Sequence, residues 1–384
     1  MDFGFTKEQI GIQKAVRDFC KGEYSKELAL ELDQEHKFPW EQFKKAADLG
    51  FIGIGFPEKY SGQGLGVIEN TIIAEEFCRA DSTIGTALLL SYFASECVLH
   101  FGSDELKEKF LPKVAEGETL SAGAFTEPDH GSDIANMDTV AVKDGDEWVI
   151  NGTKIFITNA SLAGFYTVLV QTDPDAKPTH RGQSMILVEA DREGVSTADV
   201  GLKMGIRSTA TGEVNFKDVR VPLTNLVGEE NRGFYQVLEF FDESRITIGA
   251  QALGIAECAY DRTLAYVKER EQFGQKIGQF QVTQHKLADM ATKIEASKLL
   301  VYKAAWNFDQ GNIDAALTSM AKMYAGRTAV EVADEAIQLH GGYGYITEYE
   351  VERIYRDAKI TEIYEGTKEI QKNTIAGSIL GRIK

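Results

Sequence analysis

Apolar residues recur at intervals of three and four positions along the first part of the chain, which is the spacing of amphipathic helices. The pattern predicts a first helix that starts at the capping sequence Thr6-Lys7-Glu8-Gln9 and runs to Phe19. It predicts further helices over residues 38–49, 67–79, 82–101 and 104–116. Residues 53–66 contain five glycines and one proline, so we expect a loop there.

The pattern changes near residue 120, where helical spacing gives way to short runs rich in β-branched and aromatic residues. Such runs predict strands, here over residues 139–142, 147–150, 154–159, 166–171, 184–189 and 213–221. The dipeptides Asp144-Gly145 and Asn151-Gly152 lie between runs and are typical of hairpin turns. We therefore expect an antiparallel β domain in the middle of the chain.

Helical spacing returns in the last third of the chain and predicts an antiparallel bundle. Three long helices are expected over residues 234–267, 281–310 and 313–339, and a fourth after Thr347. The order of helices, strands and helices predicts an α+β fold. Its expected parts are an all-α N-terminal domain (1–118), a middle antiparallel β domain (119–228) and a C-terminal four-helix bundle (229–384). No GxGxxG sequence follows a predicted strand, which excludes a Rossmann fold.

Composition narrows the classes of partner. The 384 residues carry a net charge of −18, which argues against binding to nucleic acid or to anionic membranes. The chain shows no secretory signal and no run of about 18 apolar residues, so we expect no membrane span. Its four cysteines form no CxxC pair and its histidines no HxxxH pair, so we expect neither disulfides nor a metal site.

The tract Ile363-Tyr364-Glu365-Gly366-Thr367 carries the first candidate chemistry. A carboxylate in an apolar cleft has a raised pKa and can take a proton from carbon near neutral pH. A neighbouring glycine lets a ligand approach the backbone closely. By itself, such a tract is more typical of a helix end or a turn.

Two segments around the predicted β domain could contact a flat heterocycle. Residues 123–133 form a loop with two glycines, a proline and several hydroxyl and carboxyl groups. In residues 154–160, regular alternation along a strand would place Phe156 and Thr158 on one face, where an aromatic ring and a hydroxyl could stack on and bind a ring system. Taken singly, a linking loop and a half-buried strand explain these segments as well.

Three segments of the predicted bundle could bind anionic groups. Asp242 and Arg245 share a helical face, and Arg245 could hold a phosphate. The segment from Arg270 to Gln281 combines an arginine with Phe273, and the segment from Gln338 to Gly344 exposes backbone next to adjacent glycines. A surface ion pair and two helix ends are the ordinary alternatives.

Together these segments resemble the acyl-CoA dehydrogenase family. The sequences FTEPDHGSD, KIFITNA, FDESR, REQFG, QLHGGYG and IYEGT occur in family order across essentially the whole chain. The resemblance implies an FAD-dependent enzyme that converts an acyl-CoA thioester to the 2-enoyl-CoA and passes electrons to an electron-transferring flavoprotein. It also implies a homotetramer, built as a dimer of dimers.

The resemblance assigns roles by position. Glu365 matches the base that removes the Cα proton while the flavin N5 accepts the Cβ hydride, and its backbone N–H is expected to polarise the thioester carbonyl. Arg270, Phe273 and Gln281 match residues that reach the FAD of a neighbouring subunit. The full set of implied cofactor-binding residues is Phe125, Thr126, Ser132, Phe156, Thr158, Arg270, Phe273, Gln281, Gln338, Gly341, Gly342, Thr367 and Glu369. The implied substrate-binding residues are Ser132, Asp242, Arg245, Tyr364 and Gly366.

Departures from the family pattern narrow the substrate. One branch takes its base from the position of Ser244, which is not a carboxylate here, and Glu243 is about 100° away around the helix, so Glu365 is favoured. No Arg or Lys lies between Asp81 and His100, which disfavours a dicarboxylic acyl group. The apolar tract 86–95 suggests a short, branched or cyclic acyl group.

Three alternatives stay open at this point. An alicyclic acyl-CoA dehydrogenase could use an additional pocket acid, for which Asp81 and Glu96 are the candidates, although we expect both to be solvated or structural. The others are an oxygen-using acyl-CoA oxidase of the same fold and a non-catalytic family member. With no C-terminal extension and no leader, the chain resembles a short tetrameric enzyme of a bacterial cytoplasm, or of the mitochondrial matrix if it is a processed form.

Overall fold

The first helix begins where the capping sequence predicts. In the computed structural model, which describes residues 4–381, α1 (Lys7–Glu23) follows Thr6, whose hydroxyl accepts a hydrogen bond from Gln9 N at 3.2 Å. Thr6 N in turn donates to Gln9 Oε1 at 3.0 Å, which completes the predicted capping box. The helix continues beyond Phe19, the predicted end, so the start was better defined by the sequence than the end.

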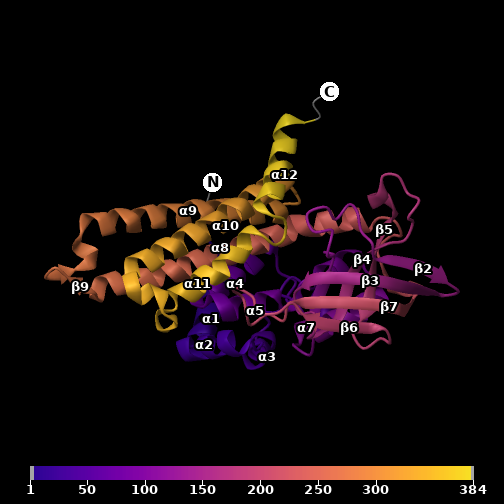
Figure 1. The fold of residues 1–384 in the computed structure, drawn as a ribbon, viewed down its shortest axis with the longest axis horizontal. Coiled ribbons are helices and arrows are strands. Elements are labelled where there is room, and N and C mark those ends of the chain that lie inside the picture. Colours follow the sequence, from indigo (N-terminus) through magenta and orange to yellow (C-terminus); the bar gives the residue numbers. More distant parts are fainter. Residues whose placement is uncertain (1–3, 382–384) are drawn as a thin grey trace.

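Six more helices complete the N-terminal part (Figure 1). One of them, α2 (Lys26–Glu35), was not predicted. The other five are α3 (Trp40–Asp48), α4 (Val67–Ala80), α5 (Ser82–Leu89), α6 (Ser95–Phe101) and α7 (Asp104–Ala115).

The single helix predicted over residues 82–101 is wrong. A 3-10 turn at Leu90–Tyr92 and the positive φ of Ala94 (66°) break it into α5 and α6. This stretch is apolar and long enough to cross a membrane by composition, but 72% of its most apolar window is buried inside the fold. The stretch is therefore best explained as part of the core, and it is only weak evidence of a membrane span.

The middle part is an eight-stranded sheet with the strand order β6-β7-β3-β2-β4-β5-β8, and β1 pairs with β4. Its strands are β1 (Leu120–Ala124), β2 (Val140–Asp144), β3 (Glu147–Ile157), β4 (Ala163–Gln171), β5 (Gln183–Glu189), β6 (Val195–Asp199), β7 (Gly212–Pro222) and β8 (Leu226–Val227). Most pairs are antiparallel, as expected, but β1 and β2 both run parallel to β4. β1, β6 and β8 were not predicted.

One of the two predicted hairpin turns is correct. β2 and β3 are joined at Gly145, which has a φ of 65°. The turn predicted at Asn151-Gly152 is wrong, because β3 continues through it with a shift in its register against β7. Gly152 is nevertheless required there, since a Cβ would lie 2.4 Å from Thr139 Oγ1. The glycine marks a bulge within one long strand rather than a connection between two.

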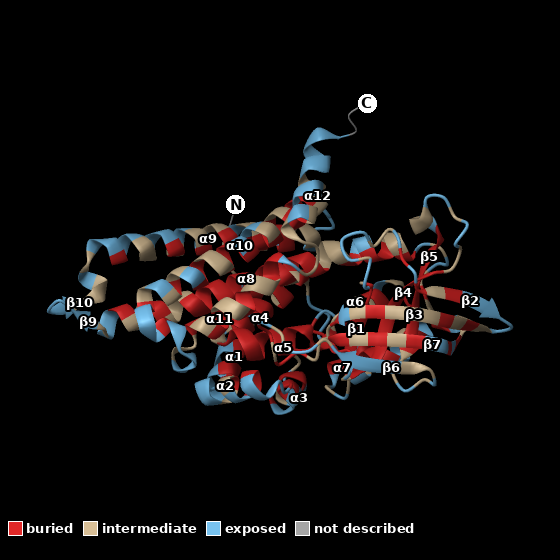
Figure 2. Cartoon of the chain, in the orientation of Figure 1, coloured by how far each residue is buried: buried red, intermediate tan, exposed pale blue. Residues whose placement is uncertain are grey.

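Five helices form the C-terminal part: α8 (Gly233–Glu269), α9 (Gln281–Asp309), α10 (Ala315–His340), α11 (Val351–Ala358) and α12 (Lys368–Leu380). The long helices α8, α9 and α10 lie side by side, and a short hairpin of β9 (Glu271–Gln272) and β10 (Gln275–Lys276) caps one end of the bundle (Figure 1). The predicted fourth helix is divided into α11 and α12. Helix α12 projects from the body and is mostly exposed (Figure 2).

The buried core crosses the boundaries between the three parts (Figure 2). The N-terminal core cluster includes Phe125 from the loop after β1 and Phe240 from α8, whose ring centroids lie 6.1 Å apart. All four cysteines are buried and unpaired. Because the shared core fixes the β-domain loop against α8, it also fixes the candidate site residues that these two elements carry.

Candidate active site

The Glu365 tract is a strained turn between a 3-10 segment (Lys359–Glu362) and α12. Glu365 has a φ of 54° and Gly366 a φ of 89°. The left-handed conformation costs a residue with a side chain about 1–2 kcal/mol, so surrounding contacts must hold Glu365 in it. Glycine is needed at 366 for a further reason, because a Cβ would lie 2.6 Å from Gln371 Nε2.

Two side chains that the sequence analysis did not single out hold this turn. Lys322 Nζ, from α10, donates to the carbonyl oxygen of Gly366 at 2.7 Å. Gln371 Nε2, from α12, donates to the carbonyl oxygens of Glu365 and Gly366 at 2.9 and 3.0 Å. Both side chains are buried, so these bonds are shielded from competition with water.

The Glu365 side chain points to α8. Ser244 Oγ donates a hydrogen bond to Glu365 Oε2 at 2.6 Å. Burial raises the pKa of Glu365, while the Ser244 hydroxyl and the positive charges of Arg245 and Lys322 oppose that rise. A carboxyl group with a raised pKa and a nearby donor can exchange a proton near neutral pH.

Arg245 is not part of a surface ion pair. Its side chain is 7% exposed, and its Nη1 lies 3.8 Å from Asp242 Oδ1. Its Nε has no hydrogen-bond partner among residues 4–381. The structure thus places Arg245 beside Glu365, and its predicted contact with coenzyme A stays a prediction.

Tyr364 connects the turn to the N-terminal helices. Its hydroxyl donates to Gln251 Oε1 on α8, and Gln251 Nε2 donates to Thr86 Oγ1 on α5 at 2.8 Å. Thr86 opens the apolar tract that we expect to line the acyl pocket. This chain of contacts therefore ties the candidate base to that tract through Gln251, which the sequence analysis missed.

The two candidate pocket acids differ in their surroundings. Asp81 is structural, as expected, because it caps α5 through Thr83 N and Ile84 N and pairs with Arg353 at 2.8 Å. Glu96 was expected to be solvated or structural, but its Oε2 is buried and has no partner within the described part of the chain. Burial, together with the negative charges of Glu243 and Glu365, raises the pKa of Glu96 to about 8.

The two segments expected to contact a flat ring lie side by side. Ile155 N, in β3, donates to the carbonyl oxygen of Thr126 at 3.0 Å. The buried Lys154 ammonium donates to Phe125 O at 3.1 Å and to Glu127 Oε1 at 2.8 Å. The Lys154–Glu127 ion pair thereby fastens the loop to the strand. Ser132, further along the loop, is exposed.

Phe156 interrupts the regular strand that the sequence analysis assumed. Its φ is 59°, which is an outlier for an aromatic residue, and its ring is 65% exposed. Thr158 lies just beyond the end of β3, so the argument that strict alternation places the two side chains on one face is wrong. A strained and exposed aromatic ring beside a fixed loop is a surface suited to a planar ligand.

A second set of predicted residues gathers around a hollow of about 470 Å³ at the far end of α8 and α10. Arg270, Gln338, Gly341 and Gly342 line it, and the Arg270 guanidinium lies 5.2 Å from the centre of the Tyr343 ring. Added Cβ atoms on Gly341 and Gly342 would meet nothing within 4 Å, so their backbone is open to a ligand.

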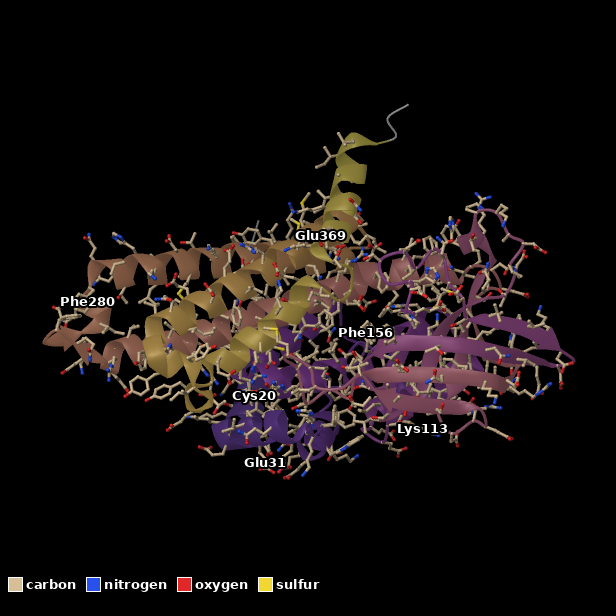
Figure 3. The ribbon with its side chains drawn as sticks, viewed as in Figure 1. Cys20, Glu31, Lys113, Phe156, Phe280 and Glu369 are labelled. Carbon is tan, nitrogen blue, oxygen red and sulfur yellow. The ribbon has the colours of Figure 1, made fainter. Side chains whose placement is uncertain are left out.

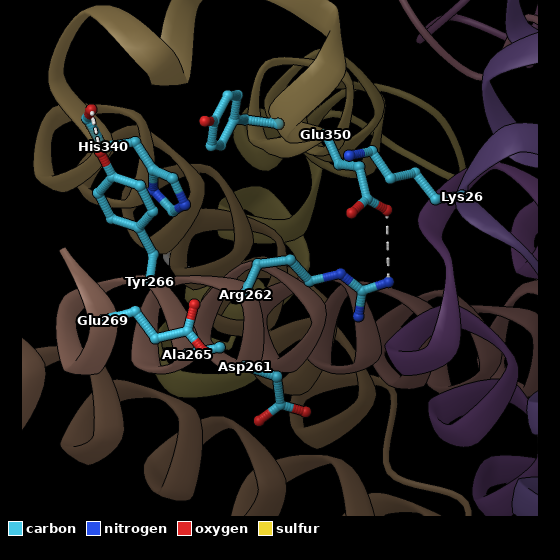
Figure 4. A pocket seen from close by; sticks show the side chains of 9 residues that line it. Lys26, Asp261, Arg262, Ala265, Tyr266, Glu269, His340 and Glu350 are labelled. Atoms are coloured by element: carbon cyan, nitrogen blue, oxygen red, sulfur yellow. Dashed lines mark hydrogen bonds and ion pairs between the residues drawn. The ribbon is translucent and has the colours of Figure 1, made fainter.

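An adjoining hollow of about 330 Å³ shares Tyr266 and His340 with the first, and the two rings stack with centroids 4.1 Å apart (Figure 4). Phe273 does not line either hollow. It lies on the β9–β10 turn and is 95% exposed, while Gln281 is the first residue of α9.

The predicted cofactor residues therefore form two separate groups. Figure 3 shows Phe156 and Glu369 near the junction of the sheet and the bundle, and Phe280, which contacts Phe273, at the opposite end of the bundle. A rise of about 1.5 Å per residue along α8 separates Arg245 from Arg270 by roughly 40 Å. The two groups of predicted cofactor residues therefore lie at opposite ends of the bundle.

Comparisons with known proteins agree over the whole fold. Three family models match in order: the acyl-CoA dehydrogenase N-terminal domain at residues 6–118, the middle domain at 122–219 and the C-terminal domain at 231–380. The chain belongs to the acyl-CoA dehydrogenase family. This confirms the resemblance, the α+β fold, the identity as an oxidoreductase and the use of FAD. The alicyclic, oxidase and non-catalytic alternatives are not favoured.

Individual relatives cover nearly the full length. The chain is 43% identical to the short-chain-specific acyl-CoA dehydrogenase of Clostridium acetobutylicum, over 99% of this chain and 100% of the relative. It is also 43% identical to acryloyl-CoA reductase (NADH) of Anaerotignum propionicum, over 100% and 97%. A chain solved in work on the electron transferring flavoprotein of Acidaminococcus fermentans and flavin-based electron bifurcation superposes with a TM-score of 0.96 and 39% identity, covering 100% of both chains.

The residues present fit the FAD of an acyl-CoA dehydrogenase. Phe156 offers an exposed ring next to the loop of Phe125 and Thr126, where the planar flavin could pack. Arg270 and the open backbone at Gly341 and Gly342 offer the cation and the close approach that a diphosphate requires. These surfaces lie at the two ends of the bundle, as a cofactor shared between subunits would need.

One cluster of metal-ligand type occurs in the described residues, at Glu127, His130 and Asp138. The Glu127 carboxylate is already used, because Lys154 and the backbone N–H groups of Asp138 and Thr139 donate to it. This acyl-CoA dehydrogenase thus uses the Glu127 carboxylate to order its loop.

Proposed function

We propose that Glu365 is the catalytic base that removes the Cα proton of an acyl-CoA thioester in α,β-dehydrogenation. The main support for this assignment is the position of the Glu365 carboxylate. It accepts a hydrogen bond from Ser244 at 2.6 Å and lies near the charges of Arg245 and Lys322. In the substrate complex, Ser244 orients the carboxylate toward the Cα–H bond. Bound FAD would supply the acceptor for the hydride that leaves Cβ. The backbone N–H of Glu365 is proposed to polarise the thioester carbonyl.

We propose a short acyl group as the substrate. The tract 86–95 is almost entirely buried and mainly apolar, and Tyr92 is fixed by a 2.8 Å hydrogen bond from its hydroxyl to Asn70 Oδ1. Phe93 packs on Phe240 with ring centroids 5.4 Å apart. These fixed rings would limit the depth of the proposed acyl pocket, and the short-chain-specific relative supports the same size class. Ser132, Asp242, Arg245, Tyr364 and Gly366 are the proposed substrate contacts.

We propose that each FAD lies between two subunits of a homotetramer. One subunit contributes Phe125, Thr126, Ser132, Phe156, Thr158, Thr367 and Glu369, and its neighbour contributes Arg270, Phe273, Gln281, Gln338, Gly341 and Gly342. The separation of the two groups along α8 and the 95% exposure of Phe273 support this assignment. We further propose an electron-transferring flavoprotein as the electron acceptor, a cytoplasmic location and a role in β-oxidation.

A second candidate is the reverse reaction, which the similarity to acryloyl-CoA reductase favours. The same residues serve it, because Glu365 then returns a proton to Cα. Mixing reduced enzyme with crotonyl-CoA, with the oxidation of the flavin recorded, would test this direction. Comparing its rate with that of reduction by butyryl-CoA indicates which direction the site favours.

The base assignment is tested with Glu365→Gln, which keeps the size of the side chain and removes its basicity. We expect FAD content and binding of coenzyme A esters to persist, while the rate of flavin reduction by butyryl-CoA under anaerobic conditions falls by at least about 1,000-fold. Glu31→Gln, at an exposed carboxylate of α2 outside the proposed site, serves as the control and keeps a rate near that of the wild type. Near-normal flavin reduction in Glu365→Gln would sink the assignment.

A further inference from the structure

Lys322 is a buried lysine on α10 whose position is not explained by an ion pair. Its side chain is 1% exposed, and none of the salt bridges found among residues 4–381 involves it. Its ammonium instead donates to the carbonyl oxygen of Gly366 at 2.7 Å. Burying a charge without a paired carboxylate is costly, so a purely structural role would be served better by a neutral donor.

The neutral donor is present beside it. Gln371 bonds the same Gly366 carbonyl oxygen and the carbonyl oxygen of Glu365. Lys322 from α10 and Gln371 from α12 thus bind the same turn. In that turn Glu365 and Gly366 have φ values of 54° and 89°. Because Gln371 already supplies the neutral bonds, the charge of Lys322 is the feature left to explain.

We propose that Lys322 is a positioning residue for the dehydrogenation, one that fixes the peptide carrying the Glu365 carboxylate and places a positive charge beside that carboxylate. This inference rests on the proposed role of Glu365 as the base. The ammonium stabilises the ionised carboxylate, which is the form able to take the Cα proton. Lys322 itself contacts neither the substrate nor the reacting atoms.

The charged surroundings of Glu365 must be considered as a set. Arg245, on α8, adds a second positive charge near Glu365. Glu96, on α6, instead interacts with Glu365 as a like charge. The further titratable groups that interact with Glu365 or with Lys322 are Cys97, Glu362 and Tyr364. Since all of them remain in a Lys322 variant, a change in the titration of Glu365 there reports the loss of the lysine charge.

The test compares Lys322→Met with Gln371→Met in the FAD-loaded enzyme. Each variant removes hydrogen bonds to the turn, but only Lys322→Met also removes a charge. The rate of flavin reduction by saturating butyryl-CoA is measured across pH 6–10, together with the affinity for a thioether analogue that cannot be oxidised. For Lys322→Met we expect a loss of about 10-fold or more at pH 7, partly recovered at high pH, because the midpoint of the pH profile moves upward. For Gln371→Met we expect a slower reaction with an unmoved midpoint.

Three outcomes would overturn the proposal. The first is a Lys322→Met enzyme with a wild-type rate and midpoint, and the second is an equal shift of the midpoint in both variants. The third comes from Lys322→Arg, which keeps the charge and the donor: we expect its midpoint to stay in place, and a shift as large as that of Lys322→Met contradicts the role of the charge. Activity retained in Glu365→Gln would instead refute the base assignment, so the two failures are distinguishable.

Discussion

The hydroxyl of Ser244 donates a hydrogen bond to the Glu365 carboxylate at 2.6 Å, although the two residues are 121 positions apart in the chain. One branch of the family is expected to carry its catalytic carboxylate at the position of Ser244. Here the same position of α8 supplies a donor to a carboxylate from a different element. The two positions at which the family can carry its base are therefore in contact. In this chain one holds the Glu365 carboxylate, and the other holds Ser244, which donates a hydrogen bond to it.

The first prediction concerns Ser244→Ala. Loss of the hydroxyl removes a bond that favours the ionised carboxylate, so the pKa of Glu365 rises further. We expect the midpoint of the pH profile for flavin reduction to move upward and the rate at pH 7 to fall several-fold. Ser244→Thr keeps the hydroxyl and is the control. A midpoint that Ser244→Ala leaves unchanged would show that the bond is absent in the substrate complex.

The second prediction concerns the buried pair of Lys154 and Glu127. Lys154→Met leaves the Glu127 carboxylate buried without its cation and releases the Phe125 carbonyl, so we expect a loss of about 3–5 kcal/mol in the free energy of unfolding and weaker retention of FAD. Lys143→Met breaks an exposed pair with Glu230 and should cost less than about 1 kcal/mol. Chemical denaturation and flavin content measure both effects, and equal losses in the two variants would contradict the prediction.

The third prediction concerns the exposed ring of Phe156. Phe156→Ala removes a side chain that is 65% exposed, so the stability of the FAD-free protein should change by less than about 0.5 kcal/mol. We expect the affinity for FAD to fall by about 10-fold or more, since the ring packs on the flavin in our proposal. Val142→Ala, on the same sheet and 62% exposed, is the control. Unchanged FAD affinity in Phe156→Ala would remove the ring from the cofactor site.

The fourth prediction concerns the pH dependence of stability through Glu96. Its pKa of about 8 in the folded protein exceeds the ordinary value near 4.5, so the folded state holds a proton that the unfolded state has released between these values. Stability from this group is present below about pH 4.5 and is lost as the pH rises through about 8. Glu96→Gln should therefore gain stability relative to the wild type between pH 5 and pH 8.

Melting temperatures at the two pH values measure this gain. Glu271→Gln is the control, because the Lys276 ammonium lowers the pKa of Glu271, and a lowered carboxyl pKa adds no pH dependence above pH 5. If the difference between Glu96→Gln and the wild type were the same at pH 5 and pH 8, the carboxyl group of Glu96 would have to be ionised throughout.

The sequence was most informative where chemistry is written in a short tract. The segment around Glu365 and the loop from Phe125 were recognisable because their residue types are adjacent in the chain. The partners of Glu365 were not, since Ser244 and Lys322 reach its turn from other helices, and the Lys322–Gly366 contact spans 44 positions. Spacing along a helix shows which face a residue shares, but it does not show which distant turn that face meets.

The errors of the sequence analysis have local physical causes. Asn151-Gly152 is a strong hairpin signal, yet its glycine serves a close approach to Thr139 within one strand. Strand periodicity predicted a regular course at Phe156, where the backbone instead adopts a φ of 59°. Glu96 was expected to be solvated or structural, whereas its Oε2 is buried without a partner in the described residues, shortly after the break between α5 and α6. Each error falls where the backbone departs from regular geometry, and two of them adjoin the proposed site.

Because α8 is long, we expect the FAD content of the protein to depend on its concentration as well as on its sequence. If FAD lies between two subunits, as we propose, an isolated subunit offers it only part of its contacts, so dilution should release flavin and subunits together. Colour per subunit and the melting temperature should then both rise with protein concentration, and added FAD should oppose dissociation. At nanomolar enzyme concentrations, the measured activity would then depend on the dissociation of subunits and FAD as well as on the chemistry of Glu365.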